Sequence, residues 1–167
     1  MHKLITLLFI ILLNVFLAAC ENNLPIVAPP AQTLTRDANG YYCLMTVVNH
    51  KGPKAQIILT DKPQALWFTS VRDAIAFTLS PEEPKNIAAI YVNDMTKANW
   101  ENPGKDNWID ARKAWYVLGS TRSGGMGAPE AVPFSTKENA DVFAEQQGGT
   151  VYAFTSIPKE YILASLN

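Results

Sequence analysis

Cysteine, histidine and excess charge of either sign are scarce in this chain, and each shortage excludes a class of function. Two cysteines and two histidines occur among 167 residues. A structural zinc site takes four ligands, usually several thiolates, and so few cysteines do not supply them. Because 14 Lys and Arg stand against 15 Asp and Glu, there is no electrostatic case for a nucleic-acid partner. The composition predicts a compact globular protein.

Long hydrophobic runs are confined to the amino terminus. Leu4 to Leu17 form one apolar run, which is short for a helix that spans a bilayer permanently. Small residues follow at Ala18 and Ala19. We interpret residues 1–19 as a signal peptide. The sequence before and including Cys20 resembles the bacterial lipobox, so Cys20 is the expected lipidation site and the first residue of the mature chain.

This interpretation divides the chain into three parts. Residues 1–19 are the signal peptide, residues 20–36 a lipidated flexible tether rich in Asn and Pro, and residues 37–167 one folded domain. Several acyl chains anchor a protein firmly to a membrane. Because Glu21 replaces the Asp that usually signals inner-membrane retention, we expect a periplasm-facing protein on the outer membrane. An uncleaved membrane anchor is the alternative.

The first half of the domain is expected to form strands around one helix. Ser70 is a suitable cap for that helix, with Asp73 in the capping-box position. A turn around residues 49–53 is expected to join the first two strands. The expected strands are 41–48, 55–60, 65–68 and 87–92, and the expected helix is 71–79.

The second half repeats this plan. At one constant offset, Phe68-Thr69-Ser70 aligns with Phe134-Ser135-Thr136, Ala74 with Ala140, and Phe77 with Phe143. Expected strands lie at 111–119 and 150–155, and a last helix or turn at 158–166. The sequence therefore predicts an α+β fold of duplicated ββαβ units, with two unrelated units as the alternative.

Sulfur ligands are concentrated at one point. If residues 41–48 form a strand, Cys43 and Met45 point to the same face, and His50 follows in the next turn. Thiolate and thioether groups are soft ligands that suit Cu(I), and imidazole extends the preference to Cu and Zn. Met126 lies between glycines, which favours a loop position. Core packing explains Cys43 and Met45 as well as ligation does.

Several blocks of the sequence resemble the NosL lipoproteins, over nearly all of the mature domain. The blocks are Tyr42-Cys43-Leu44-Met45-Thr46-Val47, His50 with Gly52-Pro53-Lys54-Ala55-Gln56, Leu66-Trp67-Phe68, Val71-Arg72-Asp73-Ala74, Ile90-Tyr91-Val92-Asn93-Asp94-Met95, Trp108-Ile109-Asp110-Ala111-Arg112, and Gly124-Gly125-Met126-Gly127-Ala128-Pro129-Glu130-Ala131-Val132-Pro133-Phe134.

The resemblance implies a copper chaperone of nitrous oxide reductase maturation. Such proteins are anchored in the bacterial envelope, bind Cu(I) and supply it for the copper centres of the enzyme. A membrane transporter complex and its periplasmic partner take part. The resemblance also implies a fold related to that of the organomercurial lyases and described as duplicated ββαβ units.

The ligand positions of the family fall on residues of this chain. Its Cys-x-Met motif falls on Cys43 and Met45, its glycine-rich methionine segment on Met126, and its histidine on His50. Relatives usually have glycine where this chain has Leu44, and a regular strand would accept leucine there. We rank Cys43 and Met126 first as ligands, then Met45 and His50.

Two other functions remain open from the sequence. The first is an enzyme of organomercurial-lyase-like fold, with Cys43 as nucleophile and His50 as base. Kinship of fold does not carry function, and a second thiol expected for cleavage of a carbon–metal bond is not free. The second is an envelope binding module in which Cys43 is merely buried.

Overall fold

The computed structural model describes residues 27–164. The predicted signal peptide, Cys20 and the first part of the predicted tether lie outside the described residues. Between Val27 and Ala164, no helix combines the length and apolar character needed to cross a membrane.

The first half of the domain forms an antiparallel sheet with one helix. Its elements are β1 (Ala55–Leu59), β2 (Lys62–Phe68), α2 (Val71–Leu79) and β3 (Ile87–Asn93). The strand β1 lies between β2 and β3, and β4 (Trp108–Asp110) extends the sheet beyond β3. All five residues of β1 are buried, as expected for a central strand.

The second half has the same topology. Its elements are β5 (Trp115–Ser123), β6 (Pro129–Phe134), α3 (Lys137–Gln147) and β7 (Thr150–Ala153). Here β5 lies between β6 and β7, all antiparallel, just as β1 lies between β2 and β3. The α+β fold of duplicated ββαβ units is therefore confirmed.

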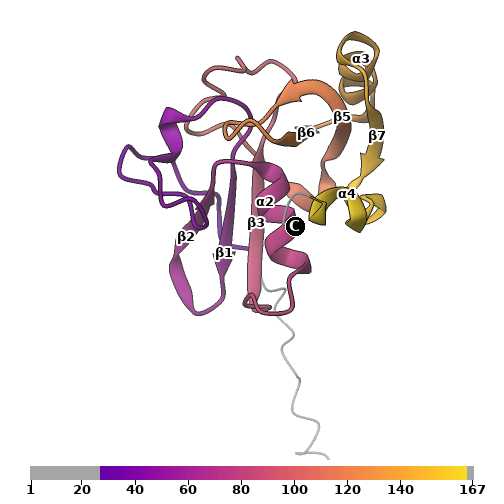
Figure 1. Ribbon diagram of the computed structural model, residues 1–167. Coiled ribbons are helices and arrows are strands. Elements are labelled where there is room, and N and C mark those ends of the chain that lie inside the picture. Colours follow the sequence, from indigo (N-terminus) through magenta and orange to yellow (C-terminus); the bar gives the residue numbers. More distant parts are fainter. Residues whose placement is uncertain (1–26, 165–167) are drawn as a thin grey trace, which may run out of the picture.

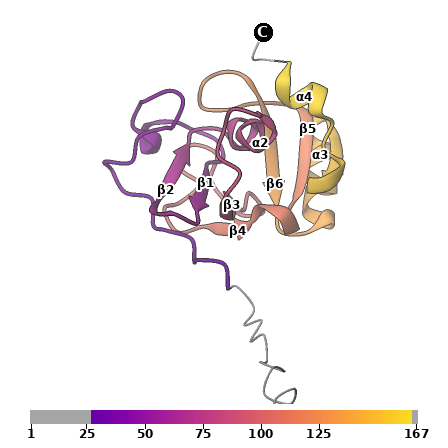
Figure 2. The same cartoon turned by 90° about the horizontal axis from the view of Figure 1, so that it is seen from below.

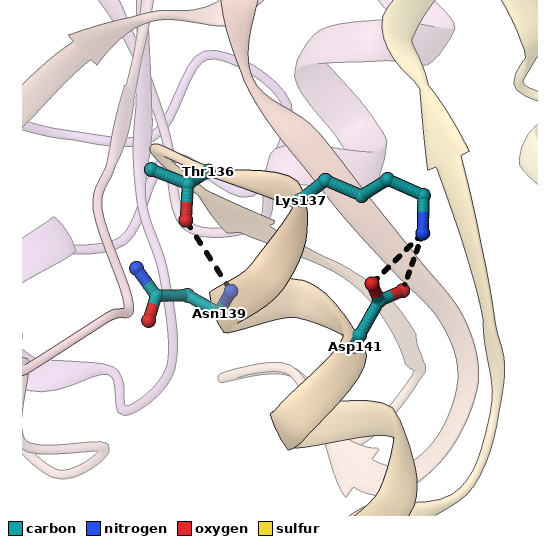
Figure 3. Close-up of polar contacts among 4 residues, drawn as sticks. All are labelled: Thr136, Lys137, Asn139 and Asp141. Carbon is teal, nitrogen blue, oxygen red and sulfur yellow. Dashed lines mark hydrogen bonds and ion pairs between the residues drawn. The ribbon is translucent and has the colours of Figure 1, made fainter.

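Both repeats begin their helix with the same side-chain cap. The Ser70 hydroxyl accepts a hydrogen bond from the Asp73 amide in α2, and the Thr136 hydroxyl accepts one from the Asn139 amide in α3. Figure 3 shows the second cap together with an exposed ion pair between Lys137, the first residue of α3, and Asp141. These caps satisfy amide groups that the first helical turn leaves free, so the two helix starts predicted from the sequence are confirmed.

One hydrophobic core joins the two repeats. Helix α2 lies between the sheets (Figures 1 and 2), and its Phe77 belongs to the same buried cluster as Tyr116 of β5 and Ile162 of α4 (Lys159–Leu163). The buried guanidinium of Arg72 donates to the carbonyls of Tyr161 and Ile162. This contact binds the end of the chain to the first repeat.

Several sequence-based expectations about strands were wrong. Residues 41–48 form a turn followed by the short 3-10 helix η1 (Val47–Asn49), so the hairpin expected around residues 49–53 does not form. Instead β1 pairs with β2 through a tight turn at residues 60–61. Residues 111–113 form a 3-10 helix before β5, and β4 and β6 are strands that were not expected from the sequence.

The ordered domain also begins earlier than expected. Gln32, placed in the predicted tether, exchanges hydrogen bonds with the side chain of Gln56 and donates to the carbonyl of Pro63. Leu34 is buried, and its amide donates to the backbone carbonyl of Lys105. Residues 32–34 therefore pack against the domain and do not act as a flexible tether.

Candidate metal centre

Cys43 lies in a compact loop that precedes β1. Asn39 and Thr46 form an isolated antiparallel bridge, and inside it the Gly40 amide donates to the Met45 carbonyl. The Gly40 carbonyl accepts from the Leu44 amide, which closes a helical-type turn around Cys43. The argument that placed Cys43 and Met45 on one face of a strand is therefore wrong, because no strand forms here.

The thiol of Cys43 is half-buried between Gly40 and Thr69. Its Sγ lies 3.7 Å from the Thr69 Oγ1, within sulfur hydrogen-bond range. A Cβ added to Gly40 would lie 2.5 Å from the same sulfur. The absence of a side chain at residue 40 thus creates the space that the thiol occupies.

Leu44 adopts a backbone conformation that glycine favours. Its φ is +58°, the one positive value among the non-glycine residues from 27 to 164, and its side chain is 78% exposed. A left-handed conformation costs an L-residue about 1 kcal/mol or more. The glycine usual at this position in the resembled family would avoid that cost, so the expectation that a regular strand accommodates Leu44 was wrong.

Two tyrosines bind the Cys43 loop to the segment after α2. The hydroxyls of Tyr41 and Tyr42 donate to the two carboxylate oxygens of Glu83, at 3.0 and 2.9 Å. The Glu83 contact raises the pKa of Tyr41, and burial followed by the same contact raises the pKa of Tyr42. One carboxylate thus holds both residues that precede Cys43.

His50 and the Met126 turn lie against each other. The His50 Nδ1 is 3.4 Å from the Gly125 carbonyl, and a Cβ on Gly125 would lie 2.6 Å from the His50 Cβ. The Gly127 amide donates to Gly124 and closes the turn between β5 and β6. In Figure 1 the purple segment before β1 and the orange β5–β6 turn meet at this point. Residues far apart in the sequence are therefore neighbours.

The candidate thioethers are accessible to solvent. The side chains of Met45 and Met126 are 41% and 47% exposed. Met95, by contrast, is buried in the core cluster that contains Trp100 and Val132. Methionine ordinarily fills gaps in a core, and the exposure of Met45 and Met126 argues against that packing role for these two residues.

A buried lysine supports the turn that carries His50. The Lys54 ammonium donates to the carbonyls of Lys51 and Gly52, and its side chain is almost fully buried. Burial lowers the pKa of Lys54 to about 8, while the negative charge of Glu130 acts in the opposite direction. These bonds fix the backbone directly after His50.

Glu130 is a buried carboxyl of β6 that contacts the start of α2. It accepts hydrogen bonds from the Ser70 hydroxyl and from the amides of Arg72 and Ala131. Burial raises the pKa of Glu130 to about 7 against the lowering effect of these bonds.

The four candidate ligands remain predictions from the sequence, and the residues that surround two of their segments were not predicted. Gly40, Thr69, Glu83 and Glu130 became visible only when the fold brought them to the loop. Glu130 did occur in one of the blocks that carry the family resemblance. Within residues 27–164, His, Cys, Asp and Glu form no group of three or more suited to a metal ion, so the candidate set includes two methionines.

Comparison with known proteins identifies the family. A sequence model of the NosL family matches residues 30–162. The chain belongs to the NosL family. The copper-binding lipoprotein NosL of Achromobacter cycloclastes is 48% identical over 149 residues, which cover 88% of this chain and 77% of that protein. The protein of the same name from Stutzerimonas stutzeri is 34% identical, over 70% of this chain and 60% of that protein.

Solved NosL structures support the fold. The crystal structure of the copper chaperone NosL from Shewanella denitrificans is similar to this chain with a TM-score of 0.73 and 34% identity, covering 78% of this chain and 98% of that one. The solution structure of apo-NosL from Achromobacter cycloclastes gives a TM-score of 0.50 and 51% identity, covering 65% and 87%. These relatives are named as copper-binding or copper chaperone proteins and not as enzymes, which disfavours the catalytic alternative.

Proposed function

We propose that this NosL protein is a copper chaperone, anchored by lipid in the bacterial envelope, that binds Cu(I) and passes it on. The names of its relatives support the metal and the lipoprotein character. The donor set supplies the oxidation state, because thiolate and thioether ligands favour Cu(I).

The observation that carries this proposal is the contact between His50 and the Met126 turn. It places the turn that carries Met126, from the other repeat, against His50, which follows the Cys43 and Met45 loop in the sequence. Because Met45 and Met126 are partly exposed, an incoming ligand from a partner has access to the metal.

The proposed mechanism is ligand exchange. Cys43 holds Cu(I) as a thiolate, and the weaker Met126, Met45 and His50 ligands leave in turn as an acceptor's sulfur or nitrogen enters. The ion changes neither its charge nor its oxidation state. Binding requires a deprotonated thiol and a neutral imidazole, so affinity should fall toward acid pH.

Anaerobic Cu(I) titration of the purified full chain in detergent tests the site. One Cu(I) per chain is expected in the wild type, and Cys43→Ser should abolish tight binding. X-ray absorption of the loaded protein should show fewer sulfur ligands in Met126→Ala than in the wild type. Unchanged stoichiometry and affinity in Cys43→Ser would refute the assignment.

The proposed destination of the copper is nitrous oxide reductase. A membrane transporter complex and its periplasmic partner are the proposed intermediaries, and family membership supports this assignment. In a denitrifying strain that lacks its own NosL, this chain should restore copper content to the reductase, whereas Cys43→Ser should not. Equal restoration by both chains would refute the route.

The proposed anchor is the lipidated Cys20, on the outer membrane and facing the periplasm. Glu21 supports outer-membrane sorting. Membrane fractionation should place the wild type in the outer membrane and Cys20→Ala outside it. Recovery of both chains in the same fraction would contradict lipid anchoring.

A further inference from the structure

The two carboxylate oxygens of Glu130 face two segments, the start of α2 and the turn that carries Met126. The Oε1 atom accepts from the Ser70 hydroxyl at 3.1 Å and from the Arg72 amide at 3.0 Å, both at the start of α2. The residue before Ser70 is Thr69, whose hydroxyl contacts the Cys43 thiol. This oxygen therefore fixes the segment that borders the cysteine.

The Oε2 atom faces the methionine turn. A Cβ added to Gly124 would lie 2.5 Å from this oxygen and 3.3 Å from the Glu130 Cδ, with the next atom, the Ala128 carbonyl oxygen, at 3.6 Å. Gly124 is the first residue of the turn that carries Met126, and it is buried. Among the described residues, the Oε2 atom is buried and has no hydrogen-bond partner.

We propose that Glu130 is a positioning residue of the metal centre, which fixes the Met126 turn relative to the α2 start that borders Cys43. This inference rests on the proposed Cu(I) site. In this role Glu130 acts on the ligands through Gly124 on one side and through Ser70 and Thr69 on the other.

Energetics support a role beyond filling the core. Burying a carboxyl without full hydrogen bonding is costly, and an apolar residue of similar volume would avoid that cost. The burial that raises the Glu130 pKa expresses the same cost. A carboxyl at this position holds the start of α2 and the Met126 turn at a fixed distance and orientation. Residues that hold metal ligands in place commonly have this role.

Gly124→Ala tests the contact from the turn side without removing any hydrogen bond of Glu130. The new Cβ would displace the turn from the carboxyl, and Gly124 is not among the glycines with positive φ. Cu(I) affinity of the full chain, measured by anaerobic competition with a chromophoric chelator, should fall roughly 10- to 100-fold. In a Met126→Ala background the same substitution should have no further effect, because the ligand that it displaces is already absent.

Substitution of Glu130 itself tests the other side. Glu130→Ala should lower the Cu(I) affinity as Gly124→Ala does. Glu130→Gln should keep most of the wild-type Cu(I) affinity, since its amide oxygen still accepts from Ser70 and Arg72. Tyr116→Phe is the control for general destabilisation. It removes a buried hydrogen bond to the Ala111 carbonyl at 2.6 Å and should leave Cu(I) affinity unchanged in the folded protein.

The outcomes separate this inference from the function on which it rests. If Met126→Ala weakens binding but Gly124→Ala does not, or if the two effects add, Glu130 has no positioning role. A Tyr116→Phe loss equal to that of Gly124→Ala would also overturn the inference. If Met126→Ala leaves Cu(I) affinity unchanged, the proposed ligand fails, and the positioning role fails with it.

Discussion

Gly40 leaves open the space that the Cys43 sulfur fills, since a Cβ at residue 40 would lie 2.5 Å from it. Gly40→Ala should therefore push the thiol out of its place beside Thr69. We expect Cu(I) affinity to fall at least about tenfold, because ligand geometry is lost while all ligands remain. Anaerobic chelator competition measures the change, and Thr69→Val, which keeps the shape beside the sulfur, should have a smaller effect. An unchanged affinity in Gly40→Ala would show that the thiol position does not matter.

Leu44 offers a test of backbone strain. Leu44→Gly should be more stable to unfolding than Leu44→Ala by about 1 kcal/mol, because only glycine is free of the Cβ penalty at positive φ. Denaturant titration of the metal-free protein measures the difference. Cu(I) affinity should hardly change, since the exposed Leu44 side chain offers no ligand atom. A less stable glycine variant would contradict the left-handed conformation.

Removal of Glu83 should loosen the loop that carries Cys43. Glu83→Ala leaves the Tyr41 and Tyr42 hydroxyls without their acceptor, so we expect a loss of about 1 kcal/mol in unfolding free energy and faster alkylation of Cys43. Glu82→Ala is the matched control, because within residues 27–164 the Glu82 side chain bonds only to the nearby Ser80 hydroxyl. Equal alkylation rates in the two variants would argue against the tyrosine contacts as a restraint.

The raised pKa of Glu130 predicts a pH dependence of stability. Its ordinary value is 4.5 and its folded value about 7, so between these values the folded state binds more protons than the unfolded state. The contribution of Glu130 to stability is then fully present below about pH 4.5 and is lost as the pH rises through 7. Relative to Glu130→Gln, the unfolding free energy of the wild type should fall with a slope of up to about 1.4 kcal/mol per pH unit.

Denaturant titrations of both proteins across this pH range provide the measurement. The charged groups that act on Glu130 are Lys54 and Asp73, and the Arg72 backbone amide donates a hydrogen bond to it. All three are the same in the wild type and in Glu130→Gln. Parallel pH profiles for the two proteins would show that Glu130 does not titrate in this range.

Local signals in the sequence were sufficient for the helices and for much of the two sheets. The caps at Ser70 and Thr136 mark the helix starts because a hydroxyl in that place satisfies a free amide of the first turn. The aligned helices revealed the duplication, an alternating pattern located β1, and a continuous apolar run located β3. Such features depend on residues a few positions apart.

The Cys43 loop was misjudged because its structure depends on distant partners. Aromatic and β-branched residues after Gly40 favour a strand, yet Tyr41 and Tyr42 bond to Glu83, and the Tyr41 amide donates to the Trp67 carbonyl. Nor does any sequence pattern announce that a carboxyl such as Glu130 will be buried. The candidate ligand residues could be named from the sequence, but the structure of the loops that carry them could not.

The shared hydrophobic cluster around Phe77, Tyr116 and Ile162 has a consequence for the history of this molecule. A polypeptide with one repeat alone would expose its side of that cluster to water, so we expect neither repeat to fold on its own. We therefore expect the two repeats to be inherited together in one gene. A chain truncated between the repeats would be expected to aggregate or be degraded.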